Sequence, residues 1–221
     1  MHNVNKAKDK KKIKTGIIGG TFNPIHVGHL ILAENAYDKL GLDKVLFMPT
    51  GRSYLKDPSS ILSADDRIEL INEAIKDNDH FELSEYETCK TGNTYTCETL
   101  SELNRLYPDE EFYFIIGEDS IYNIESWKDP QTIFDNCILV VAPRDHEPDD
   151  KLINIKDHLR DKFDADIILL DAPDIDISSS MIRKRIEENR SIRYYVSDGV
   201  RDIIIKKGFF QNKSNRANNE Q

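Results

Sequence analysis

The stretch from Thr15 to His29, TGIIGGTFNPIHVGH, decides the fold of this chain. It opens with a short apolar run of the kind expected for a strand that is covered on both faces. Two glycines and a loop fixed by Pro24 follow, and a helix is expected to begin at about Gly28. A strand, a turn and a helix in direct succession predict the first unit of an α/β fold.

The same alternation of apolar strand and amphipathic helix continues beyond this unit. It predicts a Rossmann-like α/β fold, a doubly wound and mainly parallel sheet with helices on both faces. We expect strands at 15–18, 45–48, 81–84, 112–116, 138–142 and 167–170. We expect helices at 29–40, 64–76, 96–106, 150–162, 180–188 and 197–207. Ser63, three residues before Asp66, predicts a helix start, and Gly208 predicts a helix end.

No internal repeat or long linker divides the chain, so the sequence predicts a single domain. We expect a basic flexible tail at 1–13, the folded domain at 14–210 and a disordered polar tail at 211–221. Segments 49–62 and 145–149 lack periodicity and are expected to be loops.

The composition is that of a polar protein that can still build a core. Hydrophobic residues make up 38% of the 221 residues and charged residues 32%, against a usual charged share of ~25%. Thirty Lys and Arg face 40 Asp and Glu, which gives a net charge of −10. An acidic protein repels nucleic acid and anionic membranes, so neither is an expected partner. Anionic substrates would need a few locally placed cations and backbone N–H groups.

Cysteine usage and hydropathy indicate a cytoplasmic protein. Cys89, Cys97 and Cys137 form no C-x-x-C pair, which disfavours a zinc site or a disulfide framework and favours a reducing compartment. The lysine-rich start leads into no signal-like apolar region. No apolar run approaches the ~18–20 residues of a spanning helix.

Two histidines, His26 and His29, stand three residues apart at the expected start of the first helix. Unpaired N–H groups and a partial positive charge at a helix N-terminus attract phosphate. The preceding glycines let the backbone approach a ligand closely. The spacing matches neither the dinucleotide fingerprint nor a Walker A loop. It therefore predicts a phosphate site of another kind.

Two further elements suit a nucleotide. The run ISSSMIR at 177–183 follows the last strand and offers serine hydroxyls, helix N–H groups and the Arg183 guanidinium. The run FIIGED at 114–119 ends the fourth strand. Ligands of doubly wound sheets bind at the carboxyl ends of the strands.

Together these elements resemble the signatures of the nucleotidyltransferase α/β-phosphodiesterase superfamily. Over about 14–210 the chain is similar to the bacterial nicotinate-mononucleotide adenylyltransferases. The resemblance implies that His26, His29 and Arg183 contact the triphosphate and stabilise the transition state. It implies that ATP is bound by Gly19, Gly20, Thr21, Phe22, Gly28, Gly117, Asp119, Ser178, Ser179 and Ser180.

The acceptor is suggested by GNTYTCET at 92–99, which resembles the G-x-S-Y-T-x-D-T element of that family. The resemblance implies that Tyr95 and Thr96 face the pyridine ring and its carboxylate. It also implies that Trp127, the only tryptophan, stacks on the ring, where dispersion and cation–π attraction would favour a pyridinium.

The chain departs from the family at three places. The usual Pro-Pro-His-Lys loop reads GRSYLK at 51–56, so Lys56, with Arg52 as a second cation, would contact the phosphate of the acceptor without a histidine. Asn23 stands where Asp is frequent, and Glu118 where Ala is usual. These departures leave the reaction class intact and the acceptor open.

The implied reaction joins ATP and nicotinate mononucleotide to give deamido-NAD and pyrophosphate. A phosphate oxygen of the acceptor attacks the α-phosphorus in line, so catalysis is mostly positioning and charge stabilisation. Mg²⁺ is expected as the cofactor, held mainly by substrate phosphates and water, with no metal ligands from the protein.

Other functions stay open at this point. Nicotinamide mononucleotide or another phosphate monoester, such as phosphopantetheine, could be the acceptor. Class I aminoacyl-tRNA synthetases share the histidine signature but need a longer chain and a basic surface. A nucleotide sensor would bind ATP without releasing pyrophosphate, and a redox enzyme would need the missing glycine fingerprint. The sequence leaves open a homodimer, a lid at 49–62 and a role for the basic tail.

Overall fold

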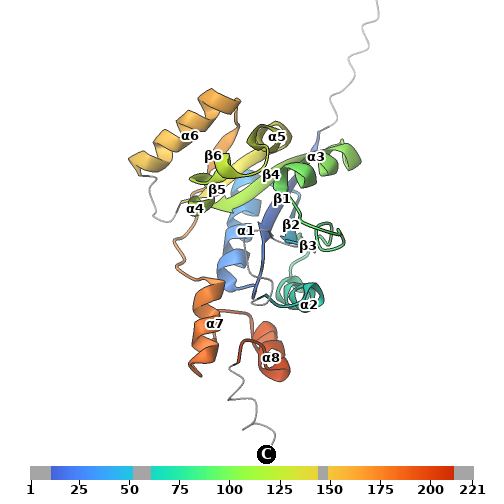
Figure 1. Cartoon of the computed structure of the whole chain (residues 1–221), viewed down its shortest axis with the longest axis vertical. Helices are drawn as coiled ribbons and strands as arrows, with labels where there is room; N and C mark the ends of the chain where they lie inside the picture. Colours follow the sequence, from blue (N-terminus) through green and yellow to red (C-terminus); the bar gives the residue numbers. More distant parts are fainter. Residues whose placement is uncertain (1–10, 52–60, 144–148, 212–221) are drawn as a thin grey trace, which may run out of the picture.

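A six-stranded parallel sheet lies between two layers of helices in the computed structural model, which describes residues 11–51, 61–143 and 149–211 (Figure 1). The strand order is β3-β2-β1-β4-β5-β6. All neighbouring strands pair in parallel. The strands are β1 (Ile13–Gly20), β2 (Lys44–Pro49), β3 (Phe81–Leu83), β4 (Glu110–Gly117), β5 (Ile138–Ala142) and β6 (Ile167–Leu169). The predicted doubly wound α/β fold is confirmed.

The helices include every one that the sequence predicts, with ends that differ by no more than two residues. They are α1 (Val27–Leu40), α2 (Ala64–Ile75), α3 (Thr96–Leu106), α4 (Glu118–Ile121), α5 (Pro130–Asn136), α6 (Asp150–Phe163), α7 (Ser179–Glu187) and α8 (Asp198–Lys207). The predicted start of α2 is confirmed, because the Asp66 amide donates to Ser63 Oγ over 3.1 Å. Gly208 ends α8 in the left-handed conformation, at φ 62°.

Between β4 and β5 lie α4, α5 and a 3₁₀ turn, η2 (Ile124–Ser126), none of which was predicted from the sequence. These elements have three to seven residues, too few for a helical period to show in the sequence. One signal was present. Asp129 is the N-cap of α5, accepting from the Thr132 amide, and Pro130 occupies the first turn, where a missing N–H costs nothing.

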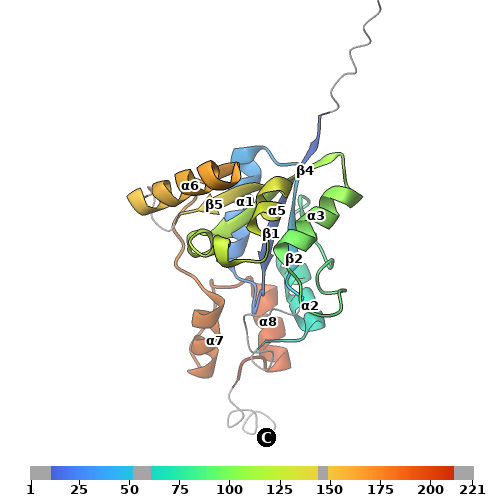
Figure 2. The ribbon, with the colours of Figure 1, turned by 45° about the horizontal axis from the view of Figure 1, so that its top comes forward.

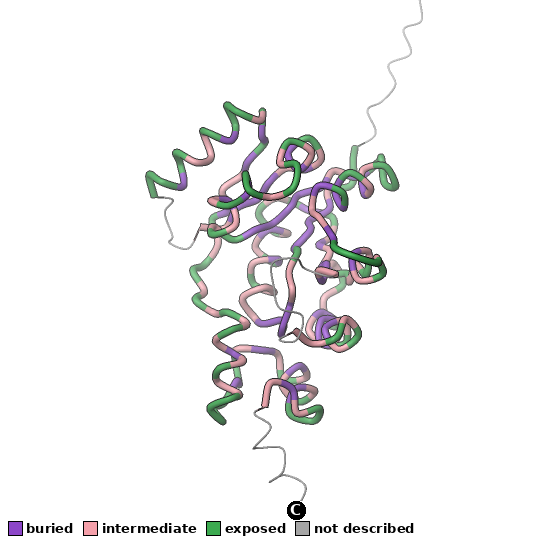
Figure 3. Tube along the Cα trace, viewed as in Figure 1, coloured by how far each residue is buried: buried purple, intermediate pink, exposed green. Residues whose placement is uncertain are grey.

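The sheet separates two apolar cores, and successive strand residues point into opposite ones. Ile17 of β1 belongs to the core under α3, α5 and α6, whereas Ile18 packs with α1, α2, α7 and α8. Figure 2 shows the two helical layers, and Figure 3 shows buried residues concentrated along the central strands. Burial on both faces explains why the strands are continuous apolar runs in the sequence.

The topology sets the position of the site. The chain leaves β1 for α1 on one face of the sheet and leaves β4, its neighbour, for the other face. Such a switch point opens a crevice at the carboxyl ends of the two strands.

The described helices and strands run from Ile13 of β1 to Lys207 of α8, and the boundaries of the domain at 14–210 stay a prediction. Most of the two predicted tails lies outside the described residues, as do Arg52 and Lys56. Among the described helices, none is long and apolar enough to cross a membrane.

Candidate active site

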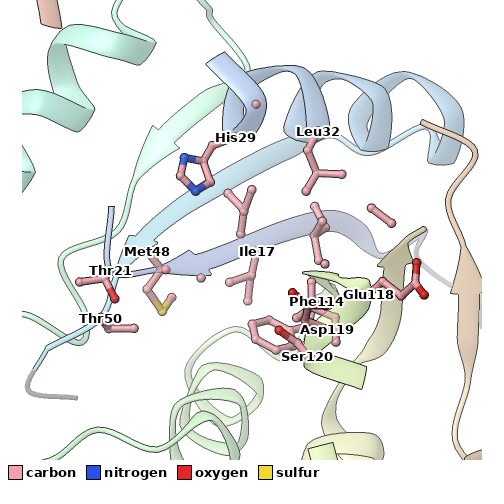
Figure 4. A pocket seen from close by; sticks show the side chains of 18 of the residues that line it. Ile17, Thr21, His29, Leu32, Met48, Thr50, Phe114, Glu118, Asp119 and Ser120 are labelled. Carbon is pink, nitrogen blue, oxygen red and sulfur yellow. The ribbon is translucent and has the colours of Figure 1, made fainter. Parts of the chain in front are cut away.

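A cavity of about 880 Å³ opens at the carboxyl ends of β1 and β4 (Figure 4). The start of α1, the start of α3, the chain after β6 and the first turn of α7 complete its walls. Fifteen residues expected in the site line it: Gly19, Gly20, Thr21, His26, Gly28, His29, Tyr95, Thr96, Gly117, Asp119, Trp127, Ser178, Ser179, Ser180 and Arg183. The structure thus brings together residues that are up to 164 positions apart, from Gly19 to Arg183.

The two signature histidines stack against each other at the start of α1. Their ring centroids lie 3.6 Å apart with an interplanar angle of 26°. The His26 amide donates to His29 Nδ1 over 3.2 Å, which fixes the orientation of the second ring. His26 is 7% exposed, and its Nδ1 has no hydrogen-bond partner among the described residues. Figure 4 shows the His29 side chain projecting from α1 into the cavity.

Burial controls the charge of this pair. It lowers the pKa of His26 from 6.5 to about 4. Burial, and then the neighbouring His26, lower the pKa of His29 well below 6.5. Both imidazoles are therefore neutral at neutral pH while the cavity holds no anion. A phosphate group beside them would favour the protonated forms, because an opposite charge stabilises the imidazolium.

Phe22 differs from the expectation that it flanks the nucleotide. Its side chain is 2% exposed and belongs to the core, and it does not line the cavity. The ring meets His29 edge-on, with centroids 4.9 Å apart, and lies 6.0 Å from the ring of Phe47. A positive φ of 48° at Phe22 accompanies this inward direction. Phe22 therefore packs against the His29 ring from the apolar core.

The serine run at 177–183 is hydrogen-bonded to the loop that precedes the two histidines. The Arg183 guanidinium donates to the Asn23 carbonyl over 2.8 Å, and Ser179 Oγ donates to the Pro24 carbonyl over 2.8 Å. Ser178 is the N-cap of α7, and its hydroxyl accepts from the Met181 amide over 3.2 Å. The serine run therefore both caps a helix and ties α7 to the histidine loop.

The predicted acceptor residues lie on the side of the sheet that α3 covers. Tyr95 is the N-cap of α3, and Lys128 Nζ lies 4.1 Å from the centroid of its ring. Lys128 also pairs with Glu98 in the first turn of α3, over 2.5 Å. The Trp127 ring meets Phe114 of β4 edge-on at 6.5 Å. Tyr95 and Trp127 both line the cavity.

Several residues that line the cavity were not predicted from the sequence. Met48 and Thr50 follow from the parallel topology, since β2 ends beside β1, and this could have been anticipated (Figure 4). Glu87, Lys128 and Asp174 come from loops, and no motif marked them. Lys56, the predicted contact of the acceptor phosphate, lies outside the described residues.

Comparisons with known proteins identify the family of the chain. The cytidylyltransferase-like family model matches residues 17–185. A probable nicotinate-nucleotide adenylyltransferase of Lachnoclostridium phytofermentans is 44% identical over 197 residues, covering 89% of this chain and 98% of the relative. The chain belongs to the cytidylyltransferase-like family of nucleotidyltransferases. A Dehalococcoides mccartyi relative of the same name is 39% identical over 209 residues, covering 91% of this chain and 98% of its own.

Solved structures support the fold of this family member. The Plasmodium falciparum nicotinic acid mononucleotide adenylyltransferase complexed with NaAD superposes with a TM-score of 0.73. The match covers 89% of this chain and 97% of that one, at 20% sequence identity. At this sequence identity, the structural similarity supports the architecture alone. The family assignment rests on the sequence relatives.

Proposed function

We propose that this protein is the enzyme that transfers AMP from ATP to nicotinate mononucleotide, giving deamido-NAD and pyrophosphate. One observation carries the proposal: a single cavity holds the stacked pair His26 and His29, the Arg183 side chain and the aromatic residues Tyr95 and Trp127. The names of the sequence relatives point to the same reaction.

The chemistry asks the protein for positioning and charge stabilisation. A phosphate oxygen of the acceptor forms a bond to the α-phosphorus of ATP, and the bond from that phosphorus to the bridging oxygen breaks. The electron pair leaves with pyrophosphate, and no covalent intermediate on the protein is needed. Negative charge builds on the leaving group, where fixed hydrogen-bond donors lower the barrier most.

His26, His29 and Arg183 are the proposed donors. Arg183 keeps its charge throughout and is held in place by its bond to the Asn23 carbonyl. The imidazoles begin neutral in a buried site, so hydrogen bonds from them are made at a low local dielectric, where they are strong. At the start of α1 the amides of Val27 and His29 already donate to the Tyr195 and His26 carbonyls, each over 3.0 Å, so side chains are proposed as the donors rather than these two N–H groups.

We propose that Mg²⁺ enters with ATP, bound mainly to phosphate oxygens and water, and neutralises part of the triphosphate charge. The described residues contain no group of three or more His, Cys, Asp or Glu side chains that could hold a metal ion.

The acceptor is proposed to lie between the start of α3 and Trp127. The indole would stack on the pyridine ring, and Tyr95 and Thr96 would face the ring and its carboxylate. Lys56 and Arg52 are proposed to contact the phosphate of the acceptor. A cytoplasmic location and a homodimer stay predictions from the sequence.

The test is pyrophosphate release with ATP and Mg²⁺, with nicotinate mononucleotide, nicotinamide mononucleotide and phosphopantetheine compared in parallel. We expect the highest kcat/KM with nicotinate mononucleotide. The His29→Ala variant serves as the control that the activity comes from this cavity. A preference for another acceptor would overturn the proposed substrate, and binding of ATP without pyrophosphate release from any pair would overturn the reaction.

A further inference from the structure

Glu87, on the loop between β3 and α3, is a buried carboxylate in the wall of the cavity. The residue is 7% exposed. Each carboxylate oxygen accepts a hydrogen bond from a different threonine. Thr94 Oγ1 donates to Glu87 Oε2 over 3.0 Å, and Thr99 Oγ1 donates to Oε1 over 2.9 Å. The two threonines are themselves 8% and 3% exposed, so both bonds join largely buried residues.

The two threonines flank the residues proposed to meet the acceptor. Thr94 directly precedes Tyr95, the N-cap of α3, and Thr99 lies in the first turn of that helix. The Thr99 amide donates to the Tyr95 carbonyl over 3.0 Å, which closes this turn. Tyr95 and Thr96 are thus flanked on both sides by residues bonded to one carboxylate.

The backbone of Glu87 touches a second segment of the site. A Cβ placed on Gly51 would lie 2.4 Å from the Glu87 carbonyl oxygen and 2.9 Å from Thr94 Cγ2. Gly51 directly follows Thr50, which lines the cavity. Glu87 therefore packs between Gly51 and the start of α3.

A stability role alone accounts poorly for a carboxylate at this position. Burial of a charge is costly, and among the described residues no basic side chain forms an ion pair with Glu87. An apolar side chain would fill the same volume without that cost. The carboxylate instead orients its neighbours, because its two oxygens each accept a hydrogen bond and so hold two hydroxyl groups at defined positions.

We propose that Glu87 is a positioning residue for the acceptor. Through Thr94 and Thr99 it orients Tyr95 and Thr96 toward the pyridine ring, without touching the reacting phosphates. This inference rests on the proposed function and extends it to Glu87, which lies outside the signature elements.

The test removes one hydroxyl while keeping the shape of the side chain. Thr94→Val should raise the KM for nicotinate mononucleotide about tenfold, the scale of one lost buried hydrogen bond, and leave the KM for ATP within about twofold. Thr94→Ser keeps the hydroxyl and should stay close to wild type. Intrinsic fluorescence of Trp127, the only tryptophan, gives the Kd of the acceptor independently of turnover.

A matched control exists at the opposite end of the sheet. Thr15 Oγ1 donates to Glu110 Oε2 over 2.6 Å in a buried threonine–glutamate pair that does not line the cavity, and Glu110 Oε1 also lies 3.4 Å from Lys44 Nζ. Thr15→Val should lower the thermal stability to a similar extent as Thr94→Val and leave both KM values unchanged.

The outcomes separate the two proposals. If wild-type protein uses nicotinate mononucleotide and Thr94→Val changes neither KM, or changes both equally, the role of Glu87 is wrong. A rise in the acceptor KM in Thr15→Val as large as in Thr94→Val would also overturn it. If wild-type protein releases no pyrophosphate with this acceptor, the proposed function fails first, and the role of Glu87 toward that acceptor fails with it.

Discussion

Acidification should destabilise this protein through His26. The imidazole is 7% exposed, stacks on His29 and has a pKa lowered by burial from 6.5 to about 4. Between these two values the unfolded chain binds a proton that the folded protein does not bind. The free energy of unfolding therefore falls as the pH falls below about 6.5, and above that pH the penalty is absent.

The magnitude follows from the size of the shift. Each pH unit in this window costs about 1.4 kcal/mol for one such group. Going from about pH 7 to about pH 5 crosses roughly 1.5 units of the window, so His26 alone should cost about 2 kcal/mol. The lowered pKa of His29 acts in the same direction.

The assay is urea unfolding of wild-type protein and of His26→Asn at both pH values. Carboxylates that titrate near pH 5 affect both proteins, so the difference between them isolates the imidazole. Wild type should lose about 2 kcal/mol more than the variant on acidification. NMR titration of the histidine ring protons checks the assignment directly. Equal losses in the two proteins, or a His26 resonance that titrates near its ordinary value, would refute the reasoning.

Three further substitutions test the site. His29→Ala should lower kcat by about 10²–10³, the usual effect of one lost transition-state donor, and a loss below about tenfold in folded protein would contradict its role. Trp127→Ala should weaken acceptor binding and leave the KM for ATP nearly unchanged; a raised ATP KM would instead place the indole at the nucleotide. Gly51→Ala would bring a Cβ within 2.4 Å of the Glu87 carbonyl, a backbone atom that no rotamer change can move. Calorimetry should show a loss of about 1–3 kcal/mol, and an unchanged Tm would refute the contact.

The sequence by itself determined the architecture and the chemical class of the site. The strands lie within a few residues of their predicted places because burial on both faces requires unbroken apolar runs, and such runs are visible without a structure. Helix ends such as Ser63 and Gly208 were predictable because capping depends on a few adjacent residues. The histidine and serine signatures were likewise local patterns.

Only the tertiary structure decided what these residues meet. The sequence could not show that Arg183 holds the Asn23 carbonyl, because that contact spans 160 residues. The sequence did not predict that the Phe22 side chain is buried in the core, because a backbone conformation with positive φ sets the direction of that ring. The lowered pKa values of His26 and His29 come mainly from desolvation, and Glu87 meets two hydroxyls, that of Thr94 before α3 and that of Thr99 within it. Patterns along the chain record which surfaces must be buried. Which atoms then face one another depends on how the loops close, and that is a property of the whole fold.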